Sequence, residues 1–384
     1  DQLRLLRTNP LFANVEASLR AGTDIGKSIL TVRVTEANPF NANISVDNYS
    51  PPSVGSERLG VNLLYRNPTG LGDEIAASYY RSTTGGSNIL DFAYRVPLNA
   101  REGTLQFRAA PNFFKITAPE FERLDINGDS QLYELSFRQP LIRSPRQEFA
   151  LSFGFTYQDG QTFIGSEPTP FSLGPDAEGR SRTSVFKFGQ DYIHRDPQGA
   201  TAVRSQFSIG TGLFDATTNS GSIPDGQFFS WLGQVQRVQR LGQAHLLIVQ
   251  ADVQLTPNGL LPSQQFVIGG GQSVRGYRQN VRAGDNGFRL SIEDRITLQR
   301  DANGTAIFQV APFIDLGSVW NVSNNPNFSA DQRFLAGVGL GLLWQPLPKL
   351  NLRLDYGYPL INLNDRGENA QDAGFYFQVI YQPF

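Results

Sequence analysis

The 384-residue chain contains no cysteine, no methionine and only two histidines. The lack of cysteine excludes disulfide bonds and thiolate metal sites, and His194 and His245 alone argue against an imidazole metal site. Charged residues make up only 18% of the chain and the net charge is −2, so nothing indicates an affinity for nucleic acid. No apolar run approaches the ~18 residues that a membrane-spanning helix requires. Because position 1 is Asp rather than Met, we expect a processed chain or a fragment.

The first 38 residues differ in pattern from the rest of the chain. Residues 1–7 have the composition of a helix end, and two strand-like runs follow at 15–20 and 28–36, separated by a turn. This order predicts the C-terminal half of a small α+β module. We assign it to a first domain that spans residues 1–38.

From residue 39 to the end, apolar and polar side chains alternate with period two. In one run, Leu352 and Leu354 share a face while Arg353 and Asp355 occupy the other. We find about 16 such runs, each near the ~9–11 residues of a tilted transmembrane strand. Residues 39–384 are therefore predicted to form an all-β domain, a 16-stranded antiparallel transmembrane β-barrel.

The gaps between the runs alternate between tight turns and longer loops, as in outer-membrane barrels with short periplasmic turns. An even number of strands places both chain ends on the periplasmic side. The alternative is a soluble all-β protein, but one face of many runs is apolar while the other mixes Arg, Glu, Asp and Gln. A soluble core does not bury that many charges, whereas a water-filled lumen accepts them.

The longest gap, residues 257–286, contains the segment QFVIGGGQSVRGYRQN at 265–280. Three adjacent glycines permit backbone angles and close approaches that a side chain forbids, and a short motif follows them. The residues concerned are Gly269, Gly270, Gly271, Val274, Arg275, Gly276 and Tyr277. We expect this loop to be held in a fixed place.

A second motif, FIDLG, lies on a later strand, where the register turns Phe313, Asp315 and Gly317 into the lumen. Glu293 lies on the inner face of the neighbouring strand. If the loop folds back into the barrel, Arg275 can meet these acids, because a guanidinium group pairs with a carboxylate through two parallel bonds. The alternative is that Arg275 is a solvated loop residue and Asp315 an ordinary lumen charge.

Signals for catalysis or metal binding are weak. Residues 125–129 have the acidic alternation of a calcium loop, but Ser130 and Ser136 replace its required Gly and Glu, so we predict a polar turn. The alternate glycines Gly337, Gly339 and Gly341 have the wrong spacing for a dinucleotide loop and are expected to leave lumen space beside the inserted loop. We therefore expect no enzymatic activity, metal or cofactor.

The two motifs together resemble those of the BamA/TpsB superfamily of outer-membrane assembly and secretion barrels. VRGY at 274–277 is similar to the motif of the sixth loop in that superfamily, and FIDLG at 313–317 to its strand motif. The resemblance implies that Arg275 is the loop arginine, that Asp315 holds it and that Glu293 is a second acid.

Within the superfamily, the chain is most similar to the TpsB (two-partner secretion, FhaC/ShlB-like) transporters. The similar segments are residues 46–48, 67–73, 260–263 and 355–360. Residues 1–38 resemble the end of a POTRA module, the periplasmic unit on which substrates dock, although TpsB proteins usually carry a plug helix and two such modules.

This resemblance implies an outer-membrane pore, surrounded by lipid, that exports a partner polypeptide. We expect a monomer, because a closed barrel leaves no unpaired sheet edge. One alternative is a BamA-like assembly factor, which would need a lateral seam between the first and last strands. The other is a passive porin, which has no reason to carry the paired motifs.

Overall fold

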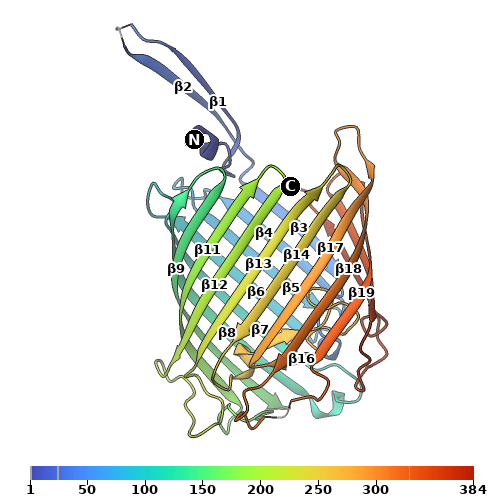
Figure 1. Ribbon diagram of the computed structural model, residues 1–384. Coiled ribbons are helices and arrows are strands. Elements are labelled where there is room, and N and C mark those ends of the chain that lie inside the picture. The colour runs from blue at the N-terminus through green and yellow to red at the C-terminus, as the bar shows by residue number, and fades with distance from the viewer. Residues whose placement is uncertain (1, 24–25, 328) are drawn as a thin grey trace.

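The computed structural model describes residues 2–23, 26–327 and 329–384. Most of the chain forms a closed antiparallel β-barrel, and a short helix and a β-hairpin project from one of its ends (Figure 1). The C-terminus lies at this same end, and the longer connecting loops lie at the opposite end (Figure 1). Within the described ranges, no helix has the length and apolar character needed to cross a membrane.

The N-terminal part consists of α1 (Gln2–Leu6), β1 (Phe12–Ala21) and β2 (Ser28–Glu36). β1 and β2 pair with each other and, among the described residues, with no other strand. Apolar side chains of this hairpin, among them Leu19 and Leu30, are exposed. The hairpin therefore offers two open strand edges beside the mouth of the barrel.

The barrel is built from consecutive strands, each paired with the one before and the one after it. The strands are β3 (Phe40–Asp47), β4 (Arg58–Arg66), β5 (Glu74–Ser82), β6 (Ser87–Pro97), β7 (Thr104–Lys115), β8 (Ile126–Arg143), β9 (Gln147–Ile164), β11 (Arg180–Asp196), β12 (Gly199–Thr211), β13 (Phe229–Leu241), β14 (His245–Leu255), β17 (Asn286–Arg300), β18 (Ala306–Trp320), β19 (Phe334–Leu347), β20 (Leu350–Pro359) and β21 (Phe375–Tyr381).

Smaller elements decorate the loops: the 3₁₀ turns η1 (Pro52–Val54), η2 (Glu122–Leu124) and η3 (Pro262–Gln264), and the two-residue strand β10 (Glu167–Pro168), which pairs with the end of β9. Pairing of β21 with β3 closes the ring. The described chain thus confirms the predicted 16-stranded antiparallel barrel.

Period-two alternation decides which side chains face out. On β20, Leu354, Tyr356 and Tyr358 are exposed on the outer surface, whereas Arg353 and Asp355 point inward and are part of a buried charge cluster. An apolar exterior around a polar interior is the reverse of a soluble core and matches a barrel surrounded by lipid.

One predicted turn is wrong. The polar turn expected at residues 125–129 is confined to Asp125, which has a left-handed backbone, because β8 already begins at Ile126. Ile126 and Asn127 continue the ladder opposite Ile164 and Phe163 of β9. Pairing with a neighbouring strand therefore overrides the local turn preference of these polar residues.

The closing seam is short. β21 and β3 pair over residues 378–381 and 44–47. Beyond Asp47, the fully buried Asn48 extends the seam with its side chain: Nδ2 donates to the Phe375 carbonyl at 2.9 Å and Oδ1 accepts from the Phe377 N–H at 2.9 Å. A side-chain amide thus replaces part of the backbone ladder.

Candidate functional site

The loop between β14 and β17, residues 257–286, folds back inside the barrel, and we call it the inserted loop. Its two short strands, β15 (Phe266–Ile268) and β16 (Arg282–Gly284), pair with each other and lie against β17 and β18. The apolar side chains at its centre form a buried cluster with two wall residues; the members are Ile268, Val274, Tyr277, Val319 and Leu335. Burial of these side chains favours the docked position of the loop.

Glycines shape the tip of the inserted loop. Gly269, Gly270 and Gly276 have φ angles of 109°, 99° and 103°, which side chains rarely adopt. Gly271 has ordinary backbone angles, but a Cβ there would lie 2.6 Å from the ring of Tyr49. The first two glycines and Gly276 therefore serve the turn itself, and Gly271 serves close packing.

Arg275, at the tip of the inserted loop, binds Asp315 of β18. Its Nε donates to Asp315 Oδ2 at 2.6 Å and its Nη2 to Oδ1 at 2.9 Å, which is the two-bond fork. The backbone N–H of Arg275 also donates to Oδ2 at 3.1 Å. Arg275 is 4% exposed and Asp315 is 0% exposed. The structure thus brings together the two residues that the motifs paired.

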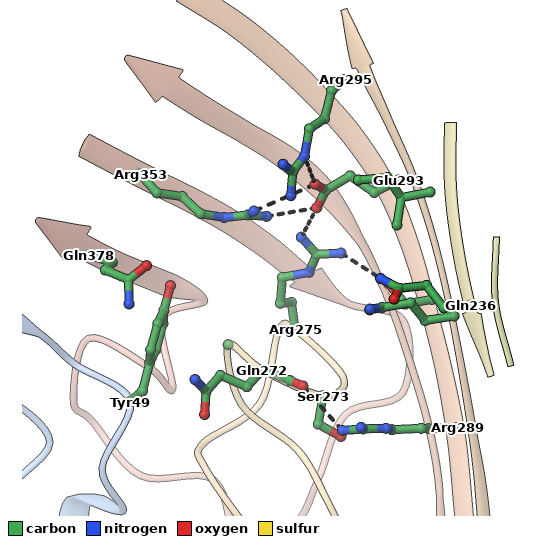
Figure 2. A pocket seen from close by; sticks show the side chains of 14 residues that line it. Tyr49, Gln236, Gln272, Ser273, Arg275, Arg289, Glu293, Arg295, Arg353 and Gln378 are labelled. Carbon is green, nitrogen blue, oxygen red and sulfur yellow. Dashed lines mark hydrogen bonds and ion pairs between the residues drawn. The ribbon is translucent and has the colours of Figure 1, made fainter. Parts of the chain in front are cut away.

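The third predicted residue, Glu293 of β17, accepts hydrogen bonds from three arginines. Figure 2 shows Arg275 pointing from the loop toward this carboxylate, with Arg295 and Arg353 reaching it from the wall. Arg275 Nη1 and Arg353 Nη2 each donate to Oε2 at 2.7 Å, and Arg295 Nε donates to Oε1 at 2.8 Å. Asp355 accepts from Arg353 Nε at 2.7 Å.

We call these six residues the charge cluster: Arg275, Arg295, Arg353, Glu293, Asp315 and Asp355. Three positive and three negative charges balance within it. Burying charges is tolerated only when they are paired and hydrogen-bonded, and Ser291 adds a bond to Asp315 at 2.6 Å. The cluster fixes the loop to β17, β18 and β20 at once.

The remaining motif residues make room for Arg275 and cover it. The Cζ atom of Arg275 lies 3.3 Å from the ring centroid of Phe313, a cation–π contact. A Cβ on Gly317 would lie 3.0 Å from a methyl carbon of Val274. The strand motif therefore supplies the carboxylate of Asp315, the aromatic face of Phe313 and, at Gly317, space for the side chain of Val274.

Glycines on β19 and β20 let the loop backbone touch the wall. A Cβ on Gly337 would lie 2.0 Å from the carbonyl oxygen of Arg275, and one on Gly357 would lie 2.6 Å from the N atom of Gly276. Of the alternate glycines of β19, Gly337 thus leaves space for the inserted loop as expected, whereas Gly339 and Gly341 lie against wall residues, among them Phe313 and Asp355.

Two tyrosines, Tyr277 and Tyr376, hold the part of the inserted loop that follows Arg275. The Tyr277 hydroxyl lies 2.8 Å from the Ala336 carbonyl oxygen and 2.9 Å from that of Ile361, and burial raises the pKa of Tyr277. The Tyr376 hydroxyl donates to the Tyr277 carbonyl at 2.6 Å and accepts from the Gly276 N–H at 2.9 Å. Sequence reasoning did not find Tyr376, although its inward position on the last strand follows from period-two alternation.

The loop between β20 and β21 supplies further partners that no motif indicated. Asp372 binds Arg278 through two bonds of 2.9 Å. Gln371, fully buried, accepts from the Gln279 N–H at 2.8 Å and donates to the Ser50 carbonyl at 2.8 Å. The inserted loop is thus tied to both sides of the closing seam.

The contacts of this site hold a loop in place. Each carboxylate of the charge cluster pairs with at least one arginine, and no group of metal-binding side chains occurs among the described residues.

The fold and this site define the class of the protein: an outer-membrane-type barrel whose lumen holds a loop anchored by a buried ion pair. The chain belongs to the haemolysin secretion/activation protein family ShlB/FhaC/HecB, whose profile matches residues 26–343. The named members of this family are outer-membrane transporters.

Among curated proteins, the outer membrane transporter CdiB of Escherichia coli is 24% identical over 300 residues, which cover 76% of this chain and 49% of that protein. The heme/hemopexin transporter protein HuxB of Haemophilus influenzae strain 86-028NP is 21% identical over 379 residues, which cover 93% of this chain and 63% of HuxB. The chain therefore spans about half the length of CdiB and less than two thirds of HuxB.

Solved structures share the fold. CdiB from Escherichia coli superposes with a TM-score of 0.81 at 20% identity and covers 97% of this chain and 68% of that one. BamA from Haemophilus ducreyi, lacking POTRA domains 1–3, superposes with a TM-score of 0.63 at 15% identity, covering 99% of this chain and 77% of that one.

Proposed function

We propose that the chain is the barrel portion of an outer-membrane pore that exports a partner polypeptide, in the manner of two-partner secretion. The observation that carries this proposal is the inserted loop, held across the lumen by the charge cluster, in which the pair of Arg275 and Asp315 is buried. A passive pore has no need of such an anchor. A pore wide enough for a polypeptide does need one, because it must stay obstructed at rest.

The proposed role of Arg275, Asp315 and Glu293 is to keep the inserted loop docked. The loop motif places the arginine, with glycines at the turns and Val274 and Tyr277 buried against the wall. Phe313 and Gly317 of the strand motif shape the cavity that receives it. Undocking would free the tip without unpairing any barrel strand.

Residues 1–38 are proposed to be the end of a periplasmic POTRA module, and residues 39–384 the membrane domain. Support comes from the helix and hairpin at the barrel end that also carries the C-terminus (Figure 1). The open edges of β1 and β2 suit strand addition, in which backbone hydrogen bonds hold an extended partner without demanding a sequence.

The proposed partners are a secreted polypeptide and the lipids of the outer membrane. The apolar exterior suits lipid, and a closed ring leaves no barrel edge that would call for a second copy, so we propose a monomer. No enzymatic step is proposed, and folding of the exported chain outside the cell supplies the driving force.

The short seam between β21 and β3 favours a second candidate, a BamA-like assembly factor that opens sideways to insert other barrels. Deleting the gene in its own host and quantifying outer-membrane and secreted proteins separates the two. Loss of one large exoprotein, with other barrels at normal levels, supports secretion. A fall in barrels across the membrane contradicts secretion and supports assembly.

A further inference from the structure

Four cavities follow one another along the lumen wall and share lining residues. The first, of about 560 Å³, opens where residues 9–11 meet the barrel mouth. It shares Arg95 and Arg138 with the second, of about 450 Å³. The second shares Arg138 and Arg204 with the third, also about 450 Å³. The third shares Arg289 with the fourth, of about 290 Å³, which is lined by Gln272 and Ser273 of the inserted loop (Figure 2).

Basic side chains predominate in the second cavity. Within the described part of the chain, its lining carries five basic residues and two acidic ones: Arg95, Arg108, Arg138, Lys187 and Arg204 against Glu134 and Asp191. The side chains of Arg95 and Arg204 are 47% and 49% exposed. An arginine has five donor hydrogens, so these half-exposed groups keep donors available to a molecule in the lumen.

Each junction between neighbouring cavities is lined by an arginine that already has a wall carboxylate. Arg138 binds Glu148 at 2.7 Å, and Arg204 lies 3.8 Å from Asp191. The last of them, Arg289, pairs with Asp252 and also donates to the carbonyl oxygen of Gln272, at the tip of the inserted loop, at 3.2 Å. The row of arginines therefore ends in direct contact with the loop.

We propose that this series of cavities, which we call the arginine track, is the route of the exported polypeptide and that it preferentially binds acidic, extended segments. The proposal rests on the export function proposed above. It assigns the transported chain to the wall formed by β4–β9, β11–β14 and β17, as far as the fourth cavity, which Arg353 of β20 also lines and where the track meets the charge cluster that anchors the inserted loop. A carboxylate that reaches Arg289 would compete for the bond to Gln272 and loosen the loop tip.

The sequence makes this route easy to test, because a chain without cysteine accepts single-cysteine variants with no background thiols. Ser136→Cys and Gln206→Cys place a thiol in the second cavity. Ser78→Cys is the matched control: it lines another cavity, between β3 and β6, whose lining includes none of the second cavity's residues. The rate of labelling by a small polar maleimide is measured on the purified full chain.

The probe is a synthetic peptide of Glu, Gly and Ser, about 16 residues and about 50 Å long when extended. At about ten times its dissociation constant it should slow labelling of the two track thiols about tenfold and leave the control unchanged. A peptide with Lys in place of Glu should protect weakly. Equal protection by both peptides, equal protection at Ser78→Cys, or none at the track positions overturns the proposal.

Charge variants check that the arginines are responsible. Arg204→Gln should raise the peptide concentration needed for half-protection of Gln206→Cys, Arg204→Lys should restore most of the effect, and Arg81→Gln, on the outer surface, should change nothing. Protection insensitive to Arg204→Gln contradicts the track. Because the assay uses no native partner, protection without secretion in the host refutes the export function alone, and secretion without protection refutes the track alone.

Discussion

Replacing Arg275 with alanine tests whether the charge cluster keeps the inserted loop docked. The substitution removes hydrogen bonds mainly from Asp315. Glu293 keeps its hydrogen bonds from Arg353, at 2.7 Å, and from Arg295, at 2.8 Å. Asp315 would retain only the Ser291 hydroxyl, at 2.6 Å, and the backbone N–H of residue 275, at 3.1 Å. A carboxylate that is 0% exposed would thus lose its counter-charge.

Removing one partner of a buried ion pair costs about 3–5 kcal/mol. The lower end applies here, because the adjoining cavity of about 290 Å³ admits water to the space that the side chain vacates. At about 1.4 kcal/mol for each tenfold change, the ratio of docked to undocked loop should fall by about a hundredfold. The barrel should still close, since no strand pairing depends on Arg275.

Hydrogen exchange of the backbone amides at 274–280, in the membrane-embedded barrel, measures this change in the docking equilibrium of the inserted loop. Arg295→Ala is the matched control: its side chain is 30% exposed and it pairs with the same Glu293, so it should cost no more than about 1 kcal/mol. Secretion by Arg275→Ala, at equal membrane abundance, should fall with the docked population.

A double-variant cycle tests whether Arg275 and Asp315 stabilise the loop as a pair. Arg275→Ala combined with Asp315→Ala should cost clearly less than the sum of the two single changes, because the second change removes the orphaned carboxylate. Additive costs, exchange rates for Arg275→Ala equal to wild type, or wild-type secretion would each refute the idea that this pair holds the loop.

Three further changes test neighbouring contacts. Tyr376→Phe removes a hydroxyl that joins two backbone groups of the inserted loop and should speed exchange there by the equivalent of about 1–3 kcal/mol; unchanged exchange contradicts the contact. Asn48→Ala should weaken the seam and lower the temperature at which the barrel unfolds on semi-native gels, because the Phe375 carbonyl loses its donor; an unchanged temperature would show that the backbone ladder suffices. Hydrogen bonds from Arg282 hold the pKa of Asp365 below its ordinary 3.8, so their stabilising effect is complete above that value and is lost as pH falls through the lower folded value. Exchange at 361–372 should quicken only in that acidic window, and Asp365→Asn should abolish the dependence.

The amino-acid sequence by itself determined the barrel and the direction of most side chains. Alternation with period two fixes which residues face lipid and which face the lumen, so the inward position of Asp315 and Glu293 followed without any three-dimensional information. The same rule, with the alternating lengths of the gaps, gave sixteen strands. Residues 126–129 departed from the expected turn, because pairing with β7 and β9 extended the strand beyond its local preference.

Only the tertiary structure decided how the inserted loop is held. Arg353 and Asp355 join the charge cluster because β20 lies two strands from β18 across the glycine-bearing β19, and the pairing register of these three strands brings their inward side chains together. Tyr376, Gln371 and Asn48 come together from opposite ends of the barrel domain, more than 300 residues apart in the case of Asn48 and Phe375. Contacts at that separation arise from closing a ring of strands, and no local pattern in a single chain encodes which side chains will meet there.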